Sequence, residues 1–286
     1  MLRSLLLNLL LLPILSWATP LTARDATLQI IRIAQPAQRI VSLAPDLTEI
    51  LFAIGAGSKV VAVSVDSDYP LAAKQLPIVG GYQSINVEAI VALHPDLVVA
   101  WTGNPAVDLA LLKKLGIPVY LENDQSFADI AATMQNLGVL AGLSQTAEAA
   151  AQNFMAKYQA LRRQYTSARP VKVFLEIDDA PLYTLSDKTL QGKILSLCGG
   201  QNIFANVKAS AAEVSVESVL AANPEVMIAT SPINLDNWQK WPEIIAVQHH
   251  ALYVINGDLL SRNGPRLIDG ARQVCQWLQT VRMNTR

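Results

Sequence analysis

Short apolar runs alternate with longer amphipathic segments from residue 39 onward. Residues 39–43 (RIVSL) contain the apolar side chains Ile40, Val41 and Leu43, two of them β-branched, which is typical of a buried strand. After Pro45 and Asp46, apolar side chains recur at helical spacing as far as Gly55, which is placed to end a helix. Further strands are expected at residues 59–64, 97–101 and 118–121, with helices at 87–93 and 107–115. This order predicts parallel β-α-β units.

The same alternation returns in the second half of the chain. Strands are expected at residues 171–176, 226–230 and 252–255, with helices at 190–197, 216–221 and 265–280. The segment VEAIVALHPDLVVA at residues 87–100 aligns without gaps to VESVLAANPEVMIA at residues 216–229. Because a helix, a Pro-acid turn and a buried strand follow one another in both copies, we expect two halves of related build.

A long helix is predicted between the two halves. Residues 126–165 are rich in alanine and are interrupted at Gly138 and Gly142, whereas residues 144–165 contain neither proline nor glycine. A helix of about 20 residues spans about 30 Å, the width of a small domain. We therefore predict an α/β protein of two Rossmann-like lobes with mostly parallel sheets, joined by one rigid helix, with the ligand cleft between the lobes. The expected divisions are residues 19–143, 144–167 and 168–286.

The first 18 residues have the pattern of a secretory signal peptide. Arg3 precedes an apolar run at residues 5–12, and Ser16, Trp17 and Ala18 place small residues before an expected cleavage site. The alternative is a membrane anchor, but the run is shorter than the roughly 20 residues that a span needs. The pattern therefore predicts an exported protein.

Composition narrows the possible partners. The chain has 22 basic and 23 acidic residues and no basic run, so nucleic acid is not an expected partner. Its two cysteines, Cys198 and Cys275, would lie in an oxidising compartment after export, which favours one disulfide. Two buried free thiols are the alternative.

Four motifs follow one another along the chain: RIVSLAPDLTEILFAIG at 39–55, SDYP at 67–70, GYQSINVE at 81–88 and LHPDLV at 93–98. In this order they resemble the periplasmic vitamin B12-binding proteins, which belong to the helical-backbone class of ABC substrate-binding proteins. The resemblance extends over about residues 38–280, and it implies a monomer that captures cobalamin or a related corrinoid in the periplasm and delivers it to an ABC importer, with no resident cofactor.

The resemblance also implies where the ligand binds. Tyr82, with Gln83 beside it, matches an aromatic platform of the first lobe, and Trp101 ends a strand at the carboxyl edge where open α/β sheets place ligands. Aromatic planes suit a corrin because they cover its apolar rim and leave its amides free for hydrogen bonds. The second-lobe binding segment corresponds to Asp258, Leu259, Leu260, Ser261 and Arg262.

Two glutamates correspond to the residues that dock the family onto arginines of the membrane permease. They are Glu88 and Glu217, which occupy equivalent places in the internal repeat. An acidic residue in the first turn of a helix is also stabilised by the helix dipole, by about 0.3–1 kcal/mol. That alternative explains one glutamate, whereas two at equivalent positions favour docking.

The chain departs from the family at the binding site and agrees with it at the cysteines. Asp66 stands where a tyrosine is found, and a second-lobe tryptophan is replaced near Ala211, within the small residues 209–212. The second-lobe platform is therefore expected to be weaker or different. The family's second-lobe disulfide corresponds to Cys198 and Cys275.

Haem and ferric siderophores are the rival ligands within the class. Haem needs an axial Tyr or His, and the histidines are His94 before a proline and the adjacent pair His249 and His250, which are poorly placed for one metal. No metal site is expected from them. Arg262 and Arg266 could bind an anionic iron chelate, so a ferric siderophore stays an alternative ligand.

An exported α/β enzyme is the alternative from a different class. Residues 55–59 (GAGSK) suggest a nucleotide loop, but they follow a helix and lack the third glycine of the dinucleotide motif. The sequence shows no Gly-x-Ser-x-Gly elbow, Cys-x-x-Cys or His-Glu-x-x-His. Without a nucleophile and base, or a metal cluster, no catalytic residue is expected.

Overall fold

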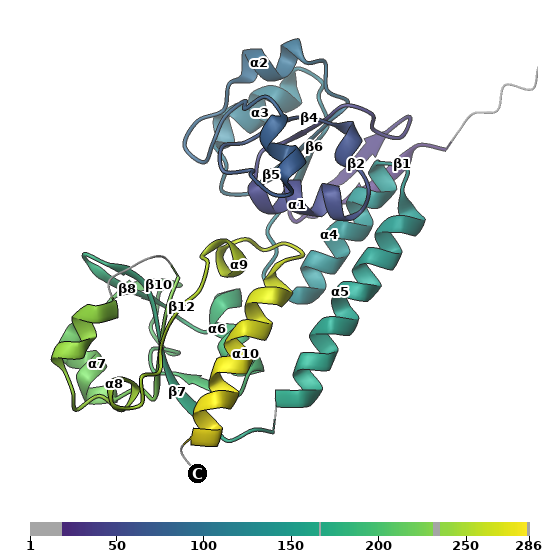
Figure 1. Cartoon of the computed structure of the whole chain (residues 1–286). Helices are drawn as coiled ribbons and strands as arrows, with labels where there is room; N and C mark the ends of the chain where they lie inside the picture. The colour runs from purple at the N-terminus through teal and green to yellow at the C-terminus, as the bar shows by residue number, and fades with distance from the viewer. Residues whose placement is uncertain (1–18, 166, 231–234, 285–286) are drawn as a thin grey trace, which may run out of the picture.

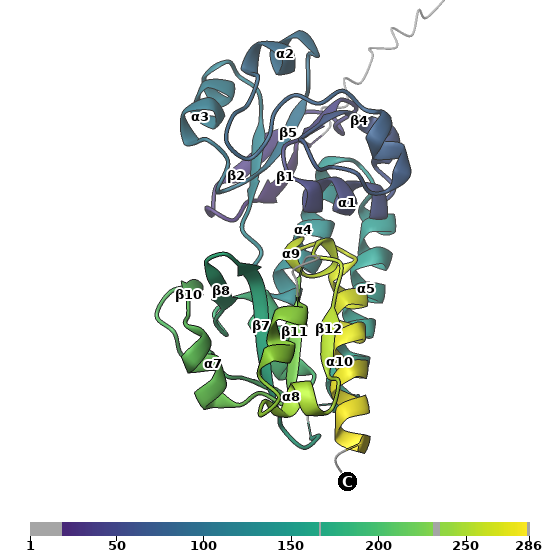
Figure 2. The ribbon, with the colours of Figure 1, turned by 60° about the vertical axis from the view of Figure 1, so that its left-hand side comes forward.

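The computed structural model describes residues 19–165, 167–230 and 235–284. The expected signal peptide at residues 1–18 lies outside the described residues. In the described part, the chain forms two α/β lobes with a pair of helices along one side (Figures 1 and 2). This confirms the predicted fold class. No helix in this part is long and apolar enough to cross a membrane.

The N-terminal lobe is built on a parallel four-stranded sheet. Its order is β4-β3-β5-β6, and apolar β-branched residues fill the strands because both faces of the sheet are covered. A separate antiparallel hairpin, which the sequence pattern did not predict, precedes it. The elements are β1 (Leu21–Arg24), β2 (Ile30–Ile33), β3 (Ile40–Ser42), α1 (Pro45–Ala53), η1 (Gly57–Lys59), β4 (Val60–Val63), η2 (Leu71–Gln75), α2 (Val87–Ala92), β5 (Leu97–Trp101), α3 (Ala106–Lys114) and β6 (Val119–Glu122).

The C-terminal lobe is built on a mixed sheet, in which three of the five described strand pairings are parallel. Strands β9, β7, β11 and β12 pair in parallel, whereas β8 pairs antiparallel with β7 and with β10. Only a short turn joins β7 to β8, and a parallel connection needs a dozen or more residues. The elements are β7 (Val171–Asp179), β8 (Leu182–Leu185), α6 (Leu190–Leu197), β9 (Gly200–Asn202), β10 (Ala211–Glu213), α7 (Val216–Ala222), β11 (Val226–Ala229), η3 (Leu235–Lys240), α8 (Ile245–Gln248), β12 (Leu252–Val254), α9 (Asp258–Ser261) and α10 (Leu267–Asn284).

The internal repeat corresponds to equivalent structure in the two lobes. His94 and Asn223, which align in the repeat, both end their helix with a φ of 47°. The acidic residue after the proline also accepts an equivalent backbone hydrogen bond in both copies. The side chain of Asp96 accepts a hydrogen bond from the backbone amide of Arg39 at 3.0 Å, and that of Glu225 accepts one from the amide of Lys172 at 3.0 Å. Each acid thus holds the start of the neighbouring strand.

Two antiparallel helices connect the lobes. α5 (Ser144–Tyr165) spans the stretch that lacks proline and glycine, and a second helix that was not predicted as part of the connection, α4 (Phe127–Leu140), packs along it (Figure 1). Gly138, expected to interrupt the helical stretch, lies inside α4 instead. A Cβ atom at this position would collide with the Cβ of Ala147 in α5, so the glycine permits the close approach of the two helices. The turn between them is at Gly142, where φ is 69°.

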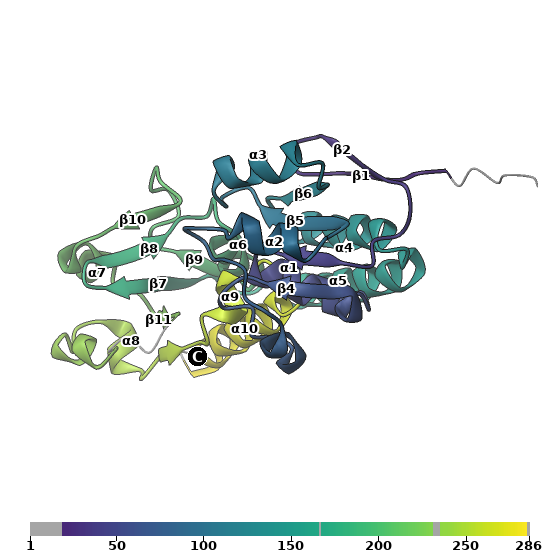
Figure 3. The ribbon, with the colours of Figure 1, turned by 90° about the horizontal axis from the view of Figure 1, so that it is seen from above.

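One hydrophobic core continues from the first lobe through these helices into the second. It includes Ile40 and Leu97 in the first sheet, Phe154 in α5, and Val173 and Ile228 in the second sheet. Burial of this surface opposes any change in the relative position of the lobes. Seen from above, the helix pair lies to one side of both sheets (Figure 3).

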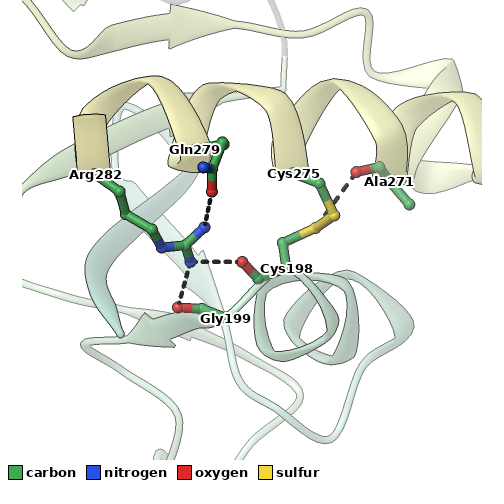
Figure 4. Close-up of a disulfide and its surroundings, with 6 residues drawn as sticks. All are labelled: Cys198, Gly199, Ala271, Cys275, Gln279 and Arg282. Atoms are coloured by element: carbon green, nitrogen blue, oxygen red, sulfur yellow. Dashed lines mark hydrogen bonds between the residues drawn. A yellow bond between two sulfur atoms is a disulfide. The ribbon is translucent and has the colours of Figure 1, made fainter. Parts of the chain in front are cut away.

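The disulfide joins Cys198 at the end of α6 to Cys275 in α10, as the sequence predicted (Figure 4). Both cysteines are fully buried. About two helical turns farther along α10, the guanidinium of Arg282 donates hydrogen bonds to the carbonyls of Cys198 and Gly199, at 2.7 and 2.9 Å. These bonds satisfy carbonyl groups that the end of α6 leaves without a partner in the helix.

Candidate ligand-binding site

A cavity of about 800 Å³ lies between the two lobes. The first lobe contributes the segments that follow the carboxyl ends of its parallel strands, and the second contributes α9 and the residues just after it. This is where open α/β sheets bind ligands, because the loops that leave neighbouring strands diverge there. The lining residues are Leu43, Ala44, Pro45, Asp46, Ser64, Val65, Asp66, Asp68, Tyr82, Trp101, Asn104, Asn123, Gln125, Asp258, Ser261, Arg262 and Asn263.

Six of the nine residues predicted for ligand binding line the cavity. They are Asp66, Tyr82, Trp101, Asp258, Ser261 and Arg262. The structure does not place the other three, Gln83, Leu259 and Leu260, in the wall of the cavity.

The helical turn of α9 explains two of these three placements. Positions 258, 261 and 262 share one face of this short helix, whereas Leu259 and Leu260 turn toward the protein interior. Leu260 is only 1% exposed and belongs to the core, and Leu259 packs against that core. For these two leucines, a role in packing therefore replaces the expected role in ligand contact.

Tyr82 and Trp101 form an aromatic wall of the cavity. Their ring centroids are 6.3 Å apart, and they are 67% and 38% exposed, so both rings are accessible to a guest. Asn104 fixes the end of the strand that carries Trp101. Its Oδ1 accepts a hydrogen bond from the amide of Trp101 at 2.9 Å, and its Nδ2 donates one to the carbonyl of Leu43 at 3.2 Å.

Arg262 is the centre of an ion network between the lobes. Its Nη1 lies 2.7 Å from Asp68 Oδ1 and 3.2 Å from Glu49 Oε1, both in the first lobe. Its Nη2 lies 3.0 Å from Asp258 Oδ1 in α9. The hydrogen bond from Arg262 holds the pKa of Asp68 below its ordinary value. Arg262 is only 9% exposed, so its guanidinium is largely shielded from solvent.

Arg266 makes a second connection from the C-terminal lobe to Glu49. Its Nε donates to Glu49 Oε2 at 2.9 Å, and its guanidinium lies over the ring of Tyr69, 4.0 Å from the centroid. Both arginines that the sequence left open for an anionic chelate are thus already paired with protein carboxylates. Glu49, which is 3% exposed, was not predicted as part of the site, because its partners lie more than 200 positions away.

Three acidic side chains lie at the junction where the lobes meet. Burial, together with Asp46 and Asp124, raises the pKa of Glu122 to about 9. Burial likewise raises the pKa of Asp124 to about 7, although a hydrogen bond from the hydroxyl of Thr133 opposes the shift. Burial also raises the pKa of Asp46, on the cavity wall. The backbone carbonyl of Asp124 accepts a hydrogen bond from the side chain of Asn263 at 2.9 Å, so this cluster contacts the second lobe directly.

Polar residues of the cavity were also missed by the sequence reading. Asn104 follows β5, and Asn123 and Gln125 follow β6. Their position after parallel strands was the available signal, since the carboxyl ends of such strands share one edge of the sheet. Asn263 directly follows the predicted binding segment, which ends at Arg262.

Glu88 and Glu217 lie outside the cavity, in the first turns of α2 and α7. Both are exposed, and both helices begin at a side-chain cap, Asn86 and Ser215 respectively. Backbone hydrogen bonding and the hydroxyl of Ser215 lower the pKa of Glu217. The two lobes therefore present equivalent exposed carboxylates.

Other residues weighed from the sequence also lie away from the cavity. Among the described residues that line it there is no histidine, so His94, His249 and His250 do not face the cleft. Ala211 lies in β10, an edge strand that pairs with β8. The segment at residues 209–212 does not contribute to the cavity wall.

The chain belongs to the periplasmic binding protein family, whose sequence model matches residues 40–255. The relatives found by sequence and structure are binding proteins. The vitamin B12-binding protein of Vibrio cholerae is 40% identical over 249 residues, covering 85% of this chain and 90% of the relative. The vitamin B12-binding protein of Yersinia pestis is 37% identical over 252 residues, which cover 87% of this chain and 89% of the relative.

Solved structures give the same picture of the fold. The periplasmic vitamin B12 binding protein BtuF of Vibrio cholerae superposes with a TM-score of 0.79 and 39% identity, over 86% of this chain and 98% of that one. The periplasmic heme-binding protein RhuT of Roseiflexus is also similar, with a TM-score of 0.75 and 26% identity over 86% and 99%. One architecture thus occurs in proteins named for corrinoid and for haem.

Proposed function

We propose that this protein captures cobalamin or a related corrinoid in the periplasm and delivers it to an ABC importer. The observation that carries the proposal is the cavity between the lobes, with the exposed rings of Tyr82 and Trp101 on its wall. Its volume of about 800 Å³ lies in the range of small-molecule sites. The relatives named for vitamin B12 support the same ligand class.

The polar groups of the cavity suit the periphery of a corrinoid. A corrin ring has broad apolar faces and carries amide side chains, which donate hydrogen bonds through N–H groups. The carboxylates of Asp66 and Asp258, and the side-chain carbonyls of Asn123 and Gln125, are acceptors for such donors. The aromatic wall would cover part of an apolar face.

Delivery would use a preformed cleft and an exposed docking face. The continuous core and the ion network at Glu49 support a small change in lobe position when the ligand binds. We propose that Glu88 and Glu217, one from each lobe, contact basic residues of the permease. Their exposure and equivalent positions in the repeat support this role.

A retention experiment tests the ligand. Purified protein is mixed with cyanocobalamin, haemin or a ferric siderophore and passed over a sizing column with detection at the absorption band of each ligand. Cyanocobalamin should elute with the protein at about one molecule per chain. Elution of free cyanocobalamin, with haemin or the ferric chelate retained, would reject the corrinoid.

A further inference from the structure

The charged side chains of the cavity wall are mainly acidic. Four aspartates line the cavity, and Arg262 is the one basic residue among the described lining residues. The neutral polar groups of the wall are amides and hydroxyls. The aspartates are Asp46, Asp66, Asp68 and Asp258.

Arg262 is not available to an anionic guest. Its guanidinium already contacts carboxylate oxygens of Glu49, Asp68 and Asp258, at 3.2, 2.7 and 3.0 Å. Its side chain is 10% exposed and already contacts three carboxylates, so a carboxylate on a guest would have to displace one of them. Arg266, behind it, is held by Glu49 in the same way. The wall therefore offers no spare positive charge among its described side chains.

Two of the aspartates lack a cationic partner. Asp66 is exposed at the cavity, and in the described chain its carboxylate has no ion pair or side-chain hydrogen bond. Asp46 lies in the first turn of α1, where one carboxylate oxygen accepts a hydrogen bond from the amide of Leu47 at 2.9 Å. Neither carboxylate forms one of the ion pairs of the network. Both can therefore act on a guest.

Shape alone does not separate the two tetrapyrrole classes. A haem-binding protein has the same fold as this chain. Tyr82 even places a phenol, one type of axial ligand for haem iron, on the cavity wall. The two ligand classes differ instead in the side chains of their rings, because the haem ring carries two propionates and the corrin ring carries neutral amides. Like charges brought together at a binding site disfavour the wrong partner, whereas amide N–H groups pair with carboxylates.

We infer that Asp46 and Asp66 are specificity determinants that reject carboxylate-bearing tetrapyrroles and accept amide-bearing ones. This deepens the proposed function, on which it rests, by defining the chemical class of guest. Salt screens an exposed charge such as Asp66 more than a half-buried one such as Asp46. Burial also raises the pKa of Asp46, which lowers its charge at a given pH, so the two aspartates are tested both singly and together.

A matched pair of corrinoids isolates this charge effect. Cyanocobalamin is compared with its derivative in which one peripheral amide is hydrolysed to a carboxylate, so that the two guests differ only in that group. Affinities are measured by absorbance titration for the unmodified protein, for Asp46→Asn, Asp66→Asn and the double variant, and for Glu148→Gln. Asparagine keeps an acceptor for the amide of Leu47, and Glu148 is an exposed residue of α5 away from the cavity, so its variant controls for net charge.

The unmodified protein should bind the carboxylate derivative about tenfold more weakly than cyanocobalamin. This ratio of affinities for the two corrinoids should be smaller in the aspartate variants and unchanged in Glu148→Gln. In the unmodified protein it should also fall as sodium chloride is raised from 20 to about 200 mM. Equal affinity for the two guests in the unmodified protein, or an undiminished difference in the double variant, overturns the inference.

Haemin distinguishes failure of the inference from failure of the proposed function. In the same titration, followed at the Soret band, the double variant should bind haemin more tightly than the unmodified protein. If neither corrinoid binds but the double variant gains haemin affinity, the corrinoid function is rejected, and the inference that Asp46 and Asp66 repel carboxylate-bearing guests is retained. Tight haemin binding by the unmodified protein rejects that inference.

Discussion

The carboxylate of Glu49 in α1 accepts a hydrogen bond from Nε of Arg266 at 2.9 Å, although 217 positions separate the two residues in the chain. Arg262, on the same loop of the second lobe, contacts the other oxygen of Glu49. A buried acid of the first lobe thus holds two arginines of the second lobe, one of which, Arg262, lines the cavity.

Replacement of Glu49 by Gln should destabilise the protein. The two arginines would lose a buried counter-charge, and removal of one partner of such a network costs about 3 kcal/mol or more. Urea unfolding at pH 7 measures the change. The control is Asp269→Asn, which removes an exposed ion pair with Arg272 and should cost less than about 1 kcal/mol. Equal stability of the two variants would show that the network does not hold the lobes together.

Stability should fall as the pH rises above the ordinary carboxyl range, because of Glu122. Its pKa in the folded protein is about 9, well above its ordinary value of 4.5, so the folded state binds a proton that the unfolded state releases. The stability that this proton supplies is complete below pH 4.5 and is lost progressively up to pH 9. The slope from this one group approaches about 1 kcal/mol per pH unit.

The variant Glu122→Gln tests this pH dependence, because glutamine stays neutral and can still accept the amide hydrogen bond of Asp124. It should match the unmodified protein at pH 5 and be more stable at pH 8.5, as measured by urea midpoints at both values. Asp124, with a pKa of about 7, keeps its own smaller contribution in the variant. Parallel pH profiles for the two proteins would contradict the assignment.

Loss of the aromatic wall should weaken corrinoid binding. Trp101→Ala removes a large accessible ring, and truncation of such an anchor typically costs about 2 kcal/mol or more, which is roughly a thirtyfold loss of affinity. Tyr82→Phe keeps the ring and should stay close to the unmodified protein. Val107→Ala, at an exposed apolar position outside the cavity, is the control. Affinity is measured by titration with cyanocobalamin.

Glu88 and Glu217 should affect transport but not capture. The double variant to Ala should keep its corrinoid affinity, because neither residue lines the cavity. Uptake of labelled cobalamin by vesicles that contain the cognate permease should fall sharply. Normal uptake by the variant would reject the docking role, and a loss of affinity would instead assign these residues to support of the cleft.

Removal of the disulfide by the Cys198→Ser, Cys275→Ser pair should destabilise the C-terminal lobe. The bond joins positions 77 residues apart, and a native disulfide of this kind contributes about 2–4 kcal/mol. Thermal unfolding with and without reductant measures the effect. Reductant should lower the melting temperature of the unmodified protein and leave that of the double variant unchanged.

The local elements and the duplication could be predicted from the sequence. The bounds of α5, α6 and β5 follow directly from apolar spacing and from the absence or presence of glycine and proline. The antiparallel strands β8 and β10 were missed because strands of four and three residues have little apolar pattern of their own. Gly138 was misread because a glycine that ends a helix and one that admits a neighbouring helix look alike in a sequence.

The two α/β halves, the long helix between them and the paired positions of Glu88 and Glu217 can be derived from the order of residues, because each depends on the periodicity or the position of nearby residues. The side of α9 that faces the cavity, the neutralisation of Arg262 and the contact of Glu49 with the second lobe appear only once the chain is folded. The charge that a guest meets depends on which side chains pair across the cleft. Such pairs form between residues that the chain order separates by 200 positions or so.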